Sequence, residues 1–358
     1  MMSDLHKFIF STSFFILIFF FSIVFNKILL KFASNLGIRN DSDIIRWATT
    51  TKPSLGGITF FFAFLFSTSV YSIFFGYENV ILKSTGIIAA CSLGFLMGLA
   101  DDAYNTKPWI KFAVQLLCAL VLIATGTYIE LFPPNYQIFN YSLTIFWIVG
   151  IMNSINMLDN MDGITSTVSV FIIIGIITVM LSNSNADISD INLLISLGIL
   201  ATLLGFLYYN WTPAKMYMGD SGSQFLGIFL GSLAIVYFWN FKNIEGTVCQ
   251  TKQIVITLLA FIIPISDTAT VTINRLAKGS SPFVGGKDHT THHLSYLGLS
   301  DRNIAILYGG ICLISIILIY IIINFVNEWS LLYSFLFGLY FLLIFGALFI
   351  NTKISKPK

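Results

Sequence analysis

Long apolar runs, separated by short polar stretches, follow one another along almost the whole chain. A helix that crosses the hydrocarbon core of a bilayer needs about 20 apolar residues. Runs of about this length lie near 8–28, 55–75, 81–100, 109–126, 141–158, 164–181, 191–209, 222–239, 254–273, 304–324 and 329–350, which makes eleven. The pattern predicts an all-α, polytopic integral membrane protein. No internal repeat or low-complexity linker divides it, so 1–358 is predicted to be a single transmembrane domain.

The composition agrees with this prediction. Of the 358 residues, 56% are hydrophobic and only 10% are charged, against about 25% charged in ordinary soluble domains. The first run has no small-residue cleavage pattern and continues past Asn26 and Lys27, so we interpret it as a retained span and not as a signal peptide. The four cysteines are scattered without a CxxC pair, which favours neither a disulfide framework nor a zinc site.

The basic residues indicate the orientation in the membrane, because cytoplasmic loops carry an excess of Lys and Arg. One side of the predicted topology holds four of them, Lys7, Lys83, Lys242 and Lys252. The other side holds fifteen: Lys27, Lys31, Arg39, Arg46, Lys52, Lys107, Lys111, Lys215, Arg275, Lys278, Lys287, Arg302, Lys353, Lys356 and Lys358. We therefore expect the N-terminus to be external and the C-terminus cytoplasmic.

The unusual polar clusters fall on the same predicted cytoplasmic side. The first is Asp101-Asp102, two adjacent carboxylates at the end of an apolar run. Like charges repel, and placing them near hydrocarbon adds to the cost, so a neutralising partner is expected. The alternative is a solvated pair where a helix leaves the membrane.

Two further clusters offer oxygen ligands. In "NSINMLDNMDGIT", Asn153, Asn156, Asp159 and Asp162 recur every third residue, so they are neighbours on a helical surface. Amide and carboxylate oxygens suit a hard cation such as Mg²⁺; a polar helix end followed by a turn at Gly163 is the alternative. In "YYNWTPAKMYMGDSGSQFLG", which contains Asn210 and Asp220, glycines beside the acid would let backbone N–H groups approach a phosphate, unless this is only turn chemistry.

The last cluster is the loop "RLAKGSSPFVGGKDHTTHHLSYLG". It holds three of the four histidines together with several basic residues. Such a loop suits an anionic ligand better than zinc, and a generic basic cytoplasmic loop is the alternative. Together the clusters indicate metal-assisted transfer of a phosphoryl group to or from a lipid, at one face of the membrane.

The order of these motifs resembles the polyprenyl-phosphate N-acetylhexosamine-1-phosphate transferases. The similarity runs from "KPSLGG" (Lys52–Gly57) through the Asp pair, "NSINMLDNMDG" and "NWTPAKMYMGDSGS" to the histidine loop. It implies that undecaprenyl phosphate attacks the β-phosphate of a UDP-N-acetylamino sugar and releases UMP. It further implies a multi-pass protein of the bacterial inner membrane with a cytoplasmic active site and no nucleic-acid partner, a homodimer being left open.

The resemblance also implies roles for residues. Asp220 and Asn156 match the ligands of Mg²⁺, for which Mn²⁺ could substitute. Asp101 and Asp102 match the pair that positions or deprotonates the lipid phosphate; we favour positioning, because a phosphate monoester is already largely dianionic at neutral pH. Asp159 and Asp162 are further catalytic candidates. The expected substrate-binding residues are Asn153, Asn210, Lys111, Lys287, His289, His292 and His293.

Three departures from the family pattern refine the expectation. Asn160 replaces a common glycine, and Thr290 stands where a histidine is usual, which makes His292 and His293 stronger candidates than His289. A PxHHHxE-like signature of the peptidoglycan branch is lacking, so UDP-GlcNAc or a relative is the expected sugar donor.

An intramembrane prenyltransferase and a transporter are the rival functions. The first leaves the histidines unexplained, and the second should place acids along a path between both faces.

Overall fold

The computed structural model describes residues 4–33, 52–76, 82–182, 190–242, 246, 248–281 and 286–355. Arg39, Arg46, Lys356, Lys358 and the segment 282–285 of the histidine loop lie outside these residues. The helices are α1 (Asp4–Phe32), α2 (Gly56–Phe75), α3 (Leu82–Tyr104), α4 (Pro108–Ala124), η3 (Pro134–Tyr136), α5 (Gln137–Leu158), α6 (Ile164–Ser182), α7 (Ile191–Asn210), α8 (Gly219–Ala234), η4 (Ile235–Trp239), α9 (Gln250–Ala260), α10 (Ile262–Ala277), α11 (Thr290–Tyr296), α12 (Asp301–Phe325) and α13 (Leu331–Ile354).

The predicted all-α membrane class is confirmed. Within the described residues, nine helices are long and apolar enough to cross a membrane, and the α9–α10 pair makes a tenth if it counts as one span. That pair is bent by 82°, so the ninth predicted span is a broken helix. The fourth predicted span is α4, an apolar helix of only 17 residues. The side of the membrane that each end faces stays a prediction.

Helix α8 lies at the centre of the bundle, in contact with α2, α3, α5 and α6. Small residues allow this close approach, as is common between membrane helices. A Cβ atom on Gly98 of α3 would come within 2.2 Å of the carbonyl oxygen of Asp220. One on Gly57 of α2 would come within 2.2 Å of the backbone nitrogen of Gly222. Both glycines are therefore required where α2 and α3 meet the start of α8.

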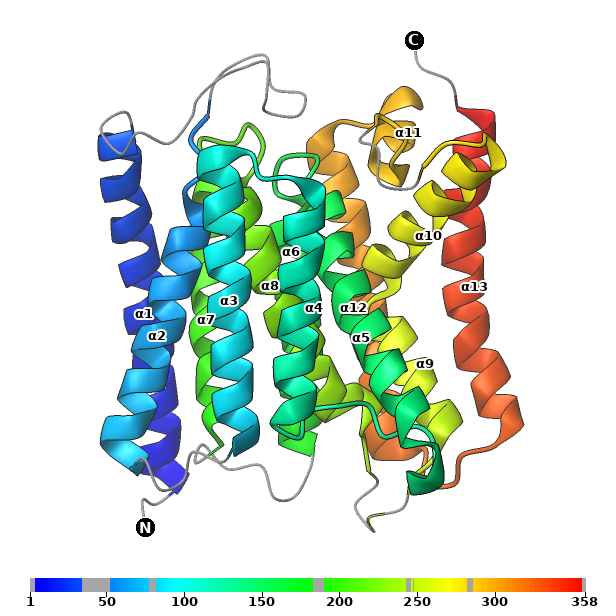
Figure 1. Cartoon of the computed structure of the whole chain (residues 1–358), viewed down its shortest axis with the longest axis horizontal. Coiled ribbons are helices and arrows are strands. Elements are labelled where there is room, and N and C mark those ends of the chain that lie inside the picture. The colour runs from blue at the N-terminus through cyan, green and yellow to red at the C-terminus, as the bar shows by residue number, and fades with distance from the viewer. Residues whose placement is uncertain are drawn as a thin grey trace.

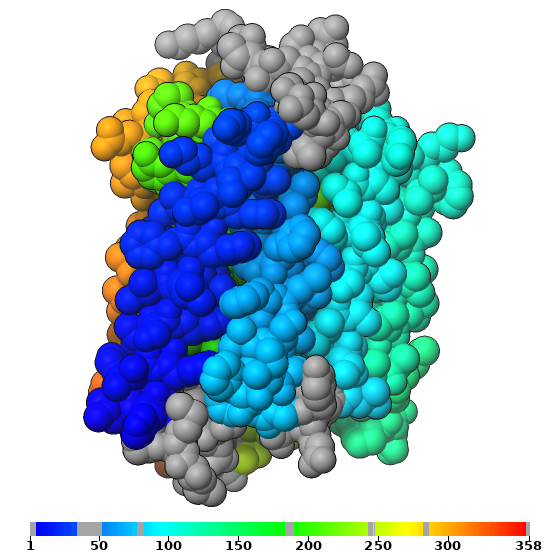
Figure 2. All heavy atoms as spheres, turned by 90° about the vertical axis from the view of Figure 1, so that its left-hand side faces the viewer, coloured from blue at the N-terminus to red at the C-terminus, as the bar shows by residue number. Residues whose placement is uncertain are grey.

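Apolar side chains also cover the outside of the bundle. Figure 2 shows α1, α2, α3 and α4 side by side across one face. Large exposed hydrophobic side chains on these helices include Phe20, Phe62, Phe66, Phe74, Leu96 and Phe112. Helix α13 is likewise exposed along most of its length. An apolar exterior over a packed interior is what a lipid-facing helix bundle requires.

The helix ends that carry the polar motifs meet at one end of the bundle. The last turns of α3 and α5 and the first turns of α4 and α8 lie there, at the same end as α11 and the last turn of α13 (Figure 1). The first turn of α1 lies at the opposite end. The fold therefore gathers the Asp pair, the Asn/Asp series and Asp220, which are distant in sequence, into one region.

Candidate active site

The start of α8 is fixed by the motif "KPSLGG". The backbone of Pro53–Gly57 pairs with Tyr217 and Met218 just before the helix: Tyr217 N–H donates to the carbonyl of Pro53 (3.0 Å), and the N–H groups of Gly56 and Gly57 donate back at 3.1 and 2.9 Å. The next residue, Gly219, has a φ of +73°, which a residue with a side chain adopts only under strain. These constraints explain why α8 begins at one definite residue, directly before Asp220.

Asp102 caps α8 from another helix. Its carboxylate accepts the N–H of Asp220 (2.8 Å) at one oxygen and the N–H of Ser221 (2.9 Å) at the other. The first N–H groups of a helix have no partner within it, and a negative charge there is stabilised by the helix dipole. We expected these N–H groups to be available to a phosphate, and the structure gives them to Asp102 instead.

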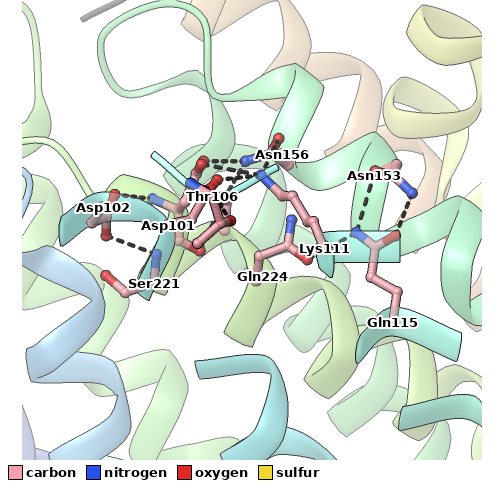
Figure 3. A network of polar contacts seen from close by, with 11 residues as sticks. Asp101, Asp102, Thr106, Lys111, Gln115, Asn153, Asn156, Ser221 and Gln224 are labelled. Atoms are coloured by element: carbon pink, nitrogen blue, oxygen red, sulfur yellow. Dashed lines mark hydrogen bonds and ion pairs between the residues drawn. The ribbon is translucent and has the colours of Figure 1, made fainter. Parts of the chain in front are cut away.

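Four residues from four helices form what we term the carboxylate centre: Asp101 of α3, Lys111 of α4, Asn156 of α5 and Asp220 of α8 (Figure 3). The Lys111 ammonium lies 3.0 Å from Asp101 Oδ2 and 3.0 Å from Asp220 Oδ2. It also donates to Asn156 Oδ1 at 3.4 Å. Lys111 is thus the neutralising partner of Asp101, whereas Asp102 has the N–H groups at the start of α8.

The orientation of each oxygen in the carboxylate centre is set by a further hydrogen bond. The second oxygen of Asp101 accepts both the backbone N–H (2.9 Å) and the hydroxyl of Thr106. The amide nitrogen of Asn156 donates to Asp220 Oδ1 and to Ser223 Oγ (2.8 Å), which turns its oxygen toward Lys111. Three oxygens therefore converge on one position from three helices.

This donor set fits a hard divalent cation. Mg²⁺ takes oxygen ligands, commonly one or two carboxylates completed by substrate phosphates and water. The carboxylate centre provides two carboxylates and one amide oxygen around the point that the Lys111 ammonium occupies, so a cation bound there would displace this ammonium. Among the described residues, no group of three or more His, Cys, Asp or Glu side chains is placed to hold a metal. A cation here would thus depend on phosphate and water for its remaining ligands.

The second half of the Asn/Asp series lies beside the loop before α8. Asp162 Oδ2 accepts the N–H of Ala214 (2.8 Å) and lies 3.6 Å from Lys52 Nζ. Asp159 is the residue directly after α5. Asn210 is buried, accepts from Ser166 Oγ (2.7 Å) and donates to the carbonyl of Met216 (3.0 Å). Asp162 and Asn210 therefore support the loop 211–218; their roles in catalysis and substrate binding stay predictions.

The histidines form a second group around the carboxylate of Asp267. His289 Nδ1 lies 2.8 Å from Asp267 Oδ2, and Thr290 donates its N–H (2.8 Å) and its hydroxyl to Oδ1. The Thr290 hydroxyl also lies 2.7 Å from the hydroxyl of Tyr308. We term Asp267, His289, Thr290 and His292 the histidine cluster. Thr290, the departure from the family string, is a fixed part of its structure.

The neighbours of this cluster set its charges. Burial, aided by the nearby His289, lowers the pKa of His292 to about 4, so this ring is neutral at pH 7. Arg275 holds Asp288 by two hydrogen bonds of 2.8 and 2.7 Å. Burial alone would raise the pKa of Asp288, but the bonds to Arg275 and its charge outweigh this and lower the pKa. His293 bonds to Ser355 Oγ (2.7 Å).

One hydrogen bond connects the loop after α5 to the helix of the histidines. The Thr291 hydroxyl donates to Asn160 Oδ1 at 2.7 Å. Asn160 stands where the family commonly has glycine, and a glycine would have no side chain to accept this hydrogen bond. Helix α5 also contacts α10, where Thr268 donates to Ser154 Oγ (2.7 Å) and Ser154 donates to the carbonyl of Pro264 (2.7 Å). Helix α5 is therefore shared by both groups.

Two buried glutamines, Gln115 and Gln224, lie beside the carboxylate centre, and the sequence analysis missed them. They fall within runs that are otherwise apolar, which is why they were counted as part of the spans. A polar residue inside a predicted span is itself the signal that could have found them.

Comparison with known proteins completes the description. The family model "Glycosyl transferase family 4" matches residues 84–238, which include the entire carboxylate centre. A probable undecaprenyl-phosphate N-acetylglucosaminyl 1-phosphate transferase of Bacillus subtilis is 30% identical over 267 residues, 72% of this chain and 69% of that protein. The chain belongs to glycosyl transferase family 4.

Other members of the family are similar over comparable lengths. A decaprenyl-phosphate N-acetylglucosaminephosphotransferase of Mycolicibacterium smegmatis is 25% identical over 71% of this chain and 68% of its own length. A phospho-N-acetylmuramoyl-pentapeptide-transferase of Campylobacter lari is 25% identical over 75% of this chain and 80% of its own. The resemblance inferred from the motifs is confirmed, on the side of the N-acetylglucosamine-1-phosphate transferases.

Proposed function

We propose that this protein transfers N-acetylglucosamine 1-phosphate from UDP-GlcNAc to undecaprenyl phosphate and releases UMP. An oxygen of the lipid phosphate attacks the β-phosphorus of the nucleotide sugar, the bond from that phosphorus to UMP breaks, and a lipid diphosphate sugar forms. Its relatives in Bacillus subtilis and Mycolicibacterium smegmatis bear names of this reaction class. They favour neither a prenyltransferase nor a transporter.

The observation that carries the proposal is the carboxylate centre. Both reactants are anions, so charge repulsion is a major part of the barrier, and cationic groups at the reacting phosphates reduce it. Lys111 places an ammonium between Asp101 and Asp220, at the end of the bundle where α3, α4, α5 and α8 bring the polar motifs together. Asp101, Asn156 and Asp220 are the residues that would hold Mg²⁺, which supplies charge neutralisation of the diphosphate when bound.

The acidic pair is better suited to positioning than to proton transfer. Both oxygens of Asp102 accept backbone N–H groups of α8. Both oxygens of Asp101 are engaged as well, by Thr106 and by Lys111. A lipid phosphate with a second pKa near 6 needs no strong base to become a nucleophile at neutral pH. Asp102 therefore acts by holding Asp220 in place, and Asp101 by holding Lys111 or the cation that would replace it.

The nucleotide-sugar end is assigned to the histidine cluster and its basic neighbours. His292 is neutral at pH 7 and can donate a hydrogen bond without adding charge. Arg275 forms an ion pair with Asp288, and Lys287 is the residue directly before Asp288. The bond between Thr291 and Asn160 ties this region to the loop after α5. Binding of the diphosphate could thus be matched to the geometry of the carboxylate centre.

The location follows the charge pattern. Because most of the described basic residues belong to the end of the bundle that holds the carboxylate centre, we place the reaction at the cytoplasmic face of a bacterial inner membrane. The product would start synthesis of a cell-surface polysaccharide.

The test is a reaction with purified protein. Wild-type protein is incubated with undecaprenyl phosphate and each of UDP-GlcNAc, UDP-GalNAc and UDP-MurNAc-pentapeptide, with and without Mg²⁺, and UMP and the lipid product are quantified. We expect UMP and a lipid-linked diphosphate sugar in equal amounts from UDP-GlcNAc, only with Mg²⁺ and lipid phosphate present. Absence of UMP release from UDP-GlcNAc would refute the proposal, and release from one of the other two donors instead would reassign the sugar.

A further inference from the structure

A layer of three amide side chains lies directly beneath the carboxylate centre. Gln115 is one helical turn further into the bundle than Lys111 on α4, and Gln224 one turn further than Asp220 on α8. Asn153 is correspondingly placed beneath Asn156 on α5. One turn of helix is about 5.4 Å. The same three helices therefore contribute one residue each to both levels.

Gln115 joins these helices by hydrogen bonds (Figure 3). Its Nε2 donates to Gln224 Oε1 at 3.0 Å and to Asn153 Oδ1 at 3.3 Å. Its Oε1 accepts from Asn153 Nδ2 at 2.8 Å, and the same nitrogen donates to the carbonyl of Val149 at 2.8 Å. We term Gln115, Asn153 and Gln224 the amide layer.

The amide layer costs free energy that an apolar layer would not. Gln115 and Gln224 are only 1% and 0% exposed, and a buried amide without its full set of bonds costs about 1–3 kcal/mol. Gln224 Nε2 has no hydrogen-bond acceptor among the residues that the structure describes. In Figure 3 this nitrogen lies on the side that faces Lys111 and Asn156, and the oxygen faces Gln115. Stability alone does not account for such an arrangement.

Hydrogen bonds can supply what apolar packing between helices does not: a fixed rotation. Apolar contacts are not directional, whereas the hydrogen bonds of Gln115 to Gln224 and Asn153 depend on the distances and angles between α4, α5 and α8. The observed arrangement of these helices points Lys111, Asn156 and Asp220 at a common position. A misplacement of about 1 Å in an active site can lower a rate by roughly a hundredfold.

We propose that Gln115 and Gln224 are positioning residues, which set the rotation and depth of α4 and α8 against α5 and thereby the geometry of the carboxylate centre. The predicted loss of turnover rests on the proposed function. The predicted loss of cation affinity does not, because it is measured without the sugar donor and the lipid.

The test compares wild type with Gln115→Leu, Gln224→Met and the double variant Gln115→Leu/Gln224→Leu. Gln253→Leu is the matched control, because Gln253 is equally buried on α9 near the other end of the bundle, where Nε2 donates to the carbonyl of Phe241 (2.9 Å). Thermal stability, Mn²⁺ affinity by electron paramagnetic resonance, and kcat and KM for UDP-GlcNAc are measured on purified protein.

We expect the double variant to melt somewhat below wild type. The Gln115–Gln224 bond is replaced by apolar contact, but Asn153 Oδ1 loses its donor, which costs about 1–3 kcal/mol. The kcat of the double variant should fall by about ten- to a hundredfold with little change in KM, and its Mn²⁺ affinity should fall several-fold. Gln253→Leu should lose stability and keep both kcat and Mn²⁺ affinity.

Wild-type kcat and Mn²⁺ affinity in a folded double variant would overturn the inference. If the double variant does not fold, Gln224→Met, which is similar in shape, decides on the same two measurements. If wild-type protein itself releases no UMP, the proposed function fails, and the Mn²⁺ affinities still test the amide layer.

Discussion

The carboxylate centre and the histidine cluster use the same kinds of side chain in different ways. In the carboxylate centre, two carboxylates share one ammonium, and the four residues come from four helices. In and around the histidine cluster, each carboxylate has a partner of its own: Asp267 lies 2.8 Å from His289 Nδ1, and Asp288 forms an ion pair with Arg275. The side chain of Asp267 is only 1% exposed, whereas those of Asp101, Asp220 and Asp288 are 11%, 19% and 25% exposed.

The difference indicates which region meets a variable charge. A buried carboxylate such as Asp267 is costly to separate from its partners, because its charge would be left uncompensated. An ammonium shared by two partly exposed carboxylates can exchange a partner with an incoming cation or phosphate at smaller cost. We therefore assign the charge rearrangement of catalysis to the carboxylate centre and the holding of the donor to the histidine cluster.

The strongest way to break this assignment is Asp220→Asn, which keeps the shape and removes the charge. Losing one charged ligand at the transition state costs on the order of 3–4 kcal/mol, or about a hundred- to a thousandfold in rate. UMP release should fall by that factor while expression is unchanged. The matched control is Asp190→Asn. Asp190 caps the N-terminus of α7 and accepts a hydrogen bond from the Tyr237 hydroxyl. Near-normal turnover in Asp220→Asn would remove Asp220 from the reaction.

The double change His292→Ala/His293→Ala probes the other region. If the histidine cluster holds the donor, KM for UDP-GlcNAc should rise by about ten- to a hundredfold, the range for a lost hydrogen bond to a charged group. KM for undecaprenyl phosphate should change little. His6→Ala provides a control, since His6 lies on α1 at the opposite end of the bundle. Unchanged kcat and KM for UDP-GlcNAc would show that His292 and His293 do not bind the donor.

Substitutions of Asp102 test whether it caps α8 or acts as a general base. As a cap, it should lose activity in steps: Asp102→Asn keeps one acceptor, and Asp102→Ala keeps none. A cap is worth about 1 kcal/mol, so we expect losses of about threefold to tenfold with an unaltered pH profile. A general base would contribute about 10²–10⁴, and Asn and Ala would then be equally inactive. Loss of the acidic limb of the pH profile in Asp102→Asn would contradict the capping role.

The smallest effect concerns pH and stability. His292 has a pKa of about 4 in the folded protein against 6.5 as its ordinary value. Between these values the unfolded chain binds a proton that the folded protein does not, so stability falls as the pH falls from about 6.5 toward 4. The contribution is on the order of 1–3 kcal/mol. Melting of wild type and His292→Gln at pH 7 and pH 5 should show a smaller loss in the variant. Equal losses would disprove a buried neutral ring.

Much of the fold could be predicted from the chain because apolar run length determines membrane helices directly. The exception is the span near 254–273, where α9 and α10 meet at a bend. Pro264 lies in the first turn of α10, where its missing N–H is tolerated. That proline was visible within the predicted span and is the signal for a break.

The site could be predicted by residue type and less well by role. Asp101 and Asp102 were treated as one pair, yet adjacent helical residues point about 100° apart. One therefore reaches Lys111 and the other reaches the first turn of α8. The amide layer depends on how α4, α5 and α8 are rotated against one another, which helical periodicity alone does not specify.

The most direct test of the central claim is Mn²⁺ binding by purified protein, followed by electron paramagnetic resonance in wild type, Asp220→Asn and Asn156→Ala. If Asp101, Asn156 and Asp220 form one cation site, wild type should bind one Mn²⁺ that Mg²⁺ displaces. Both variants should bind it at least tenfold more weakly, with UDP-GlcNAc strengthening the wild-type site. Mn²⁺ affinity that is equal in all three proteins would contradict the account and separate the carboxylate centre from metal binding.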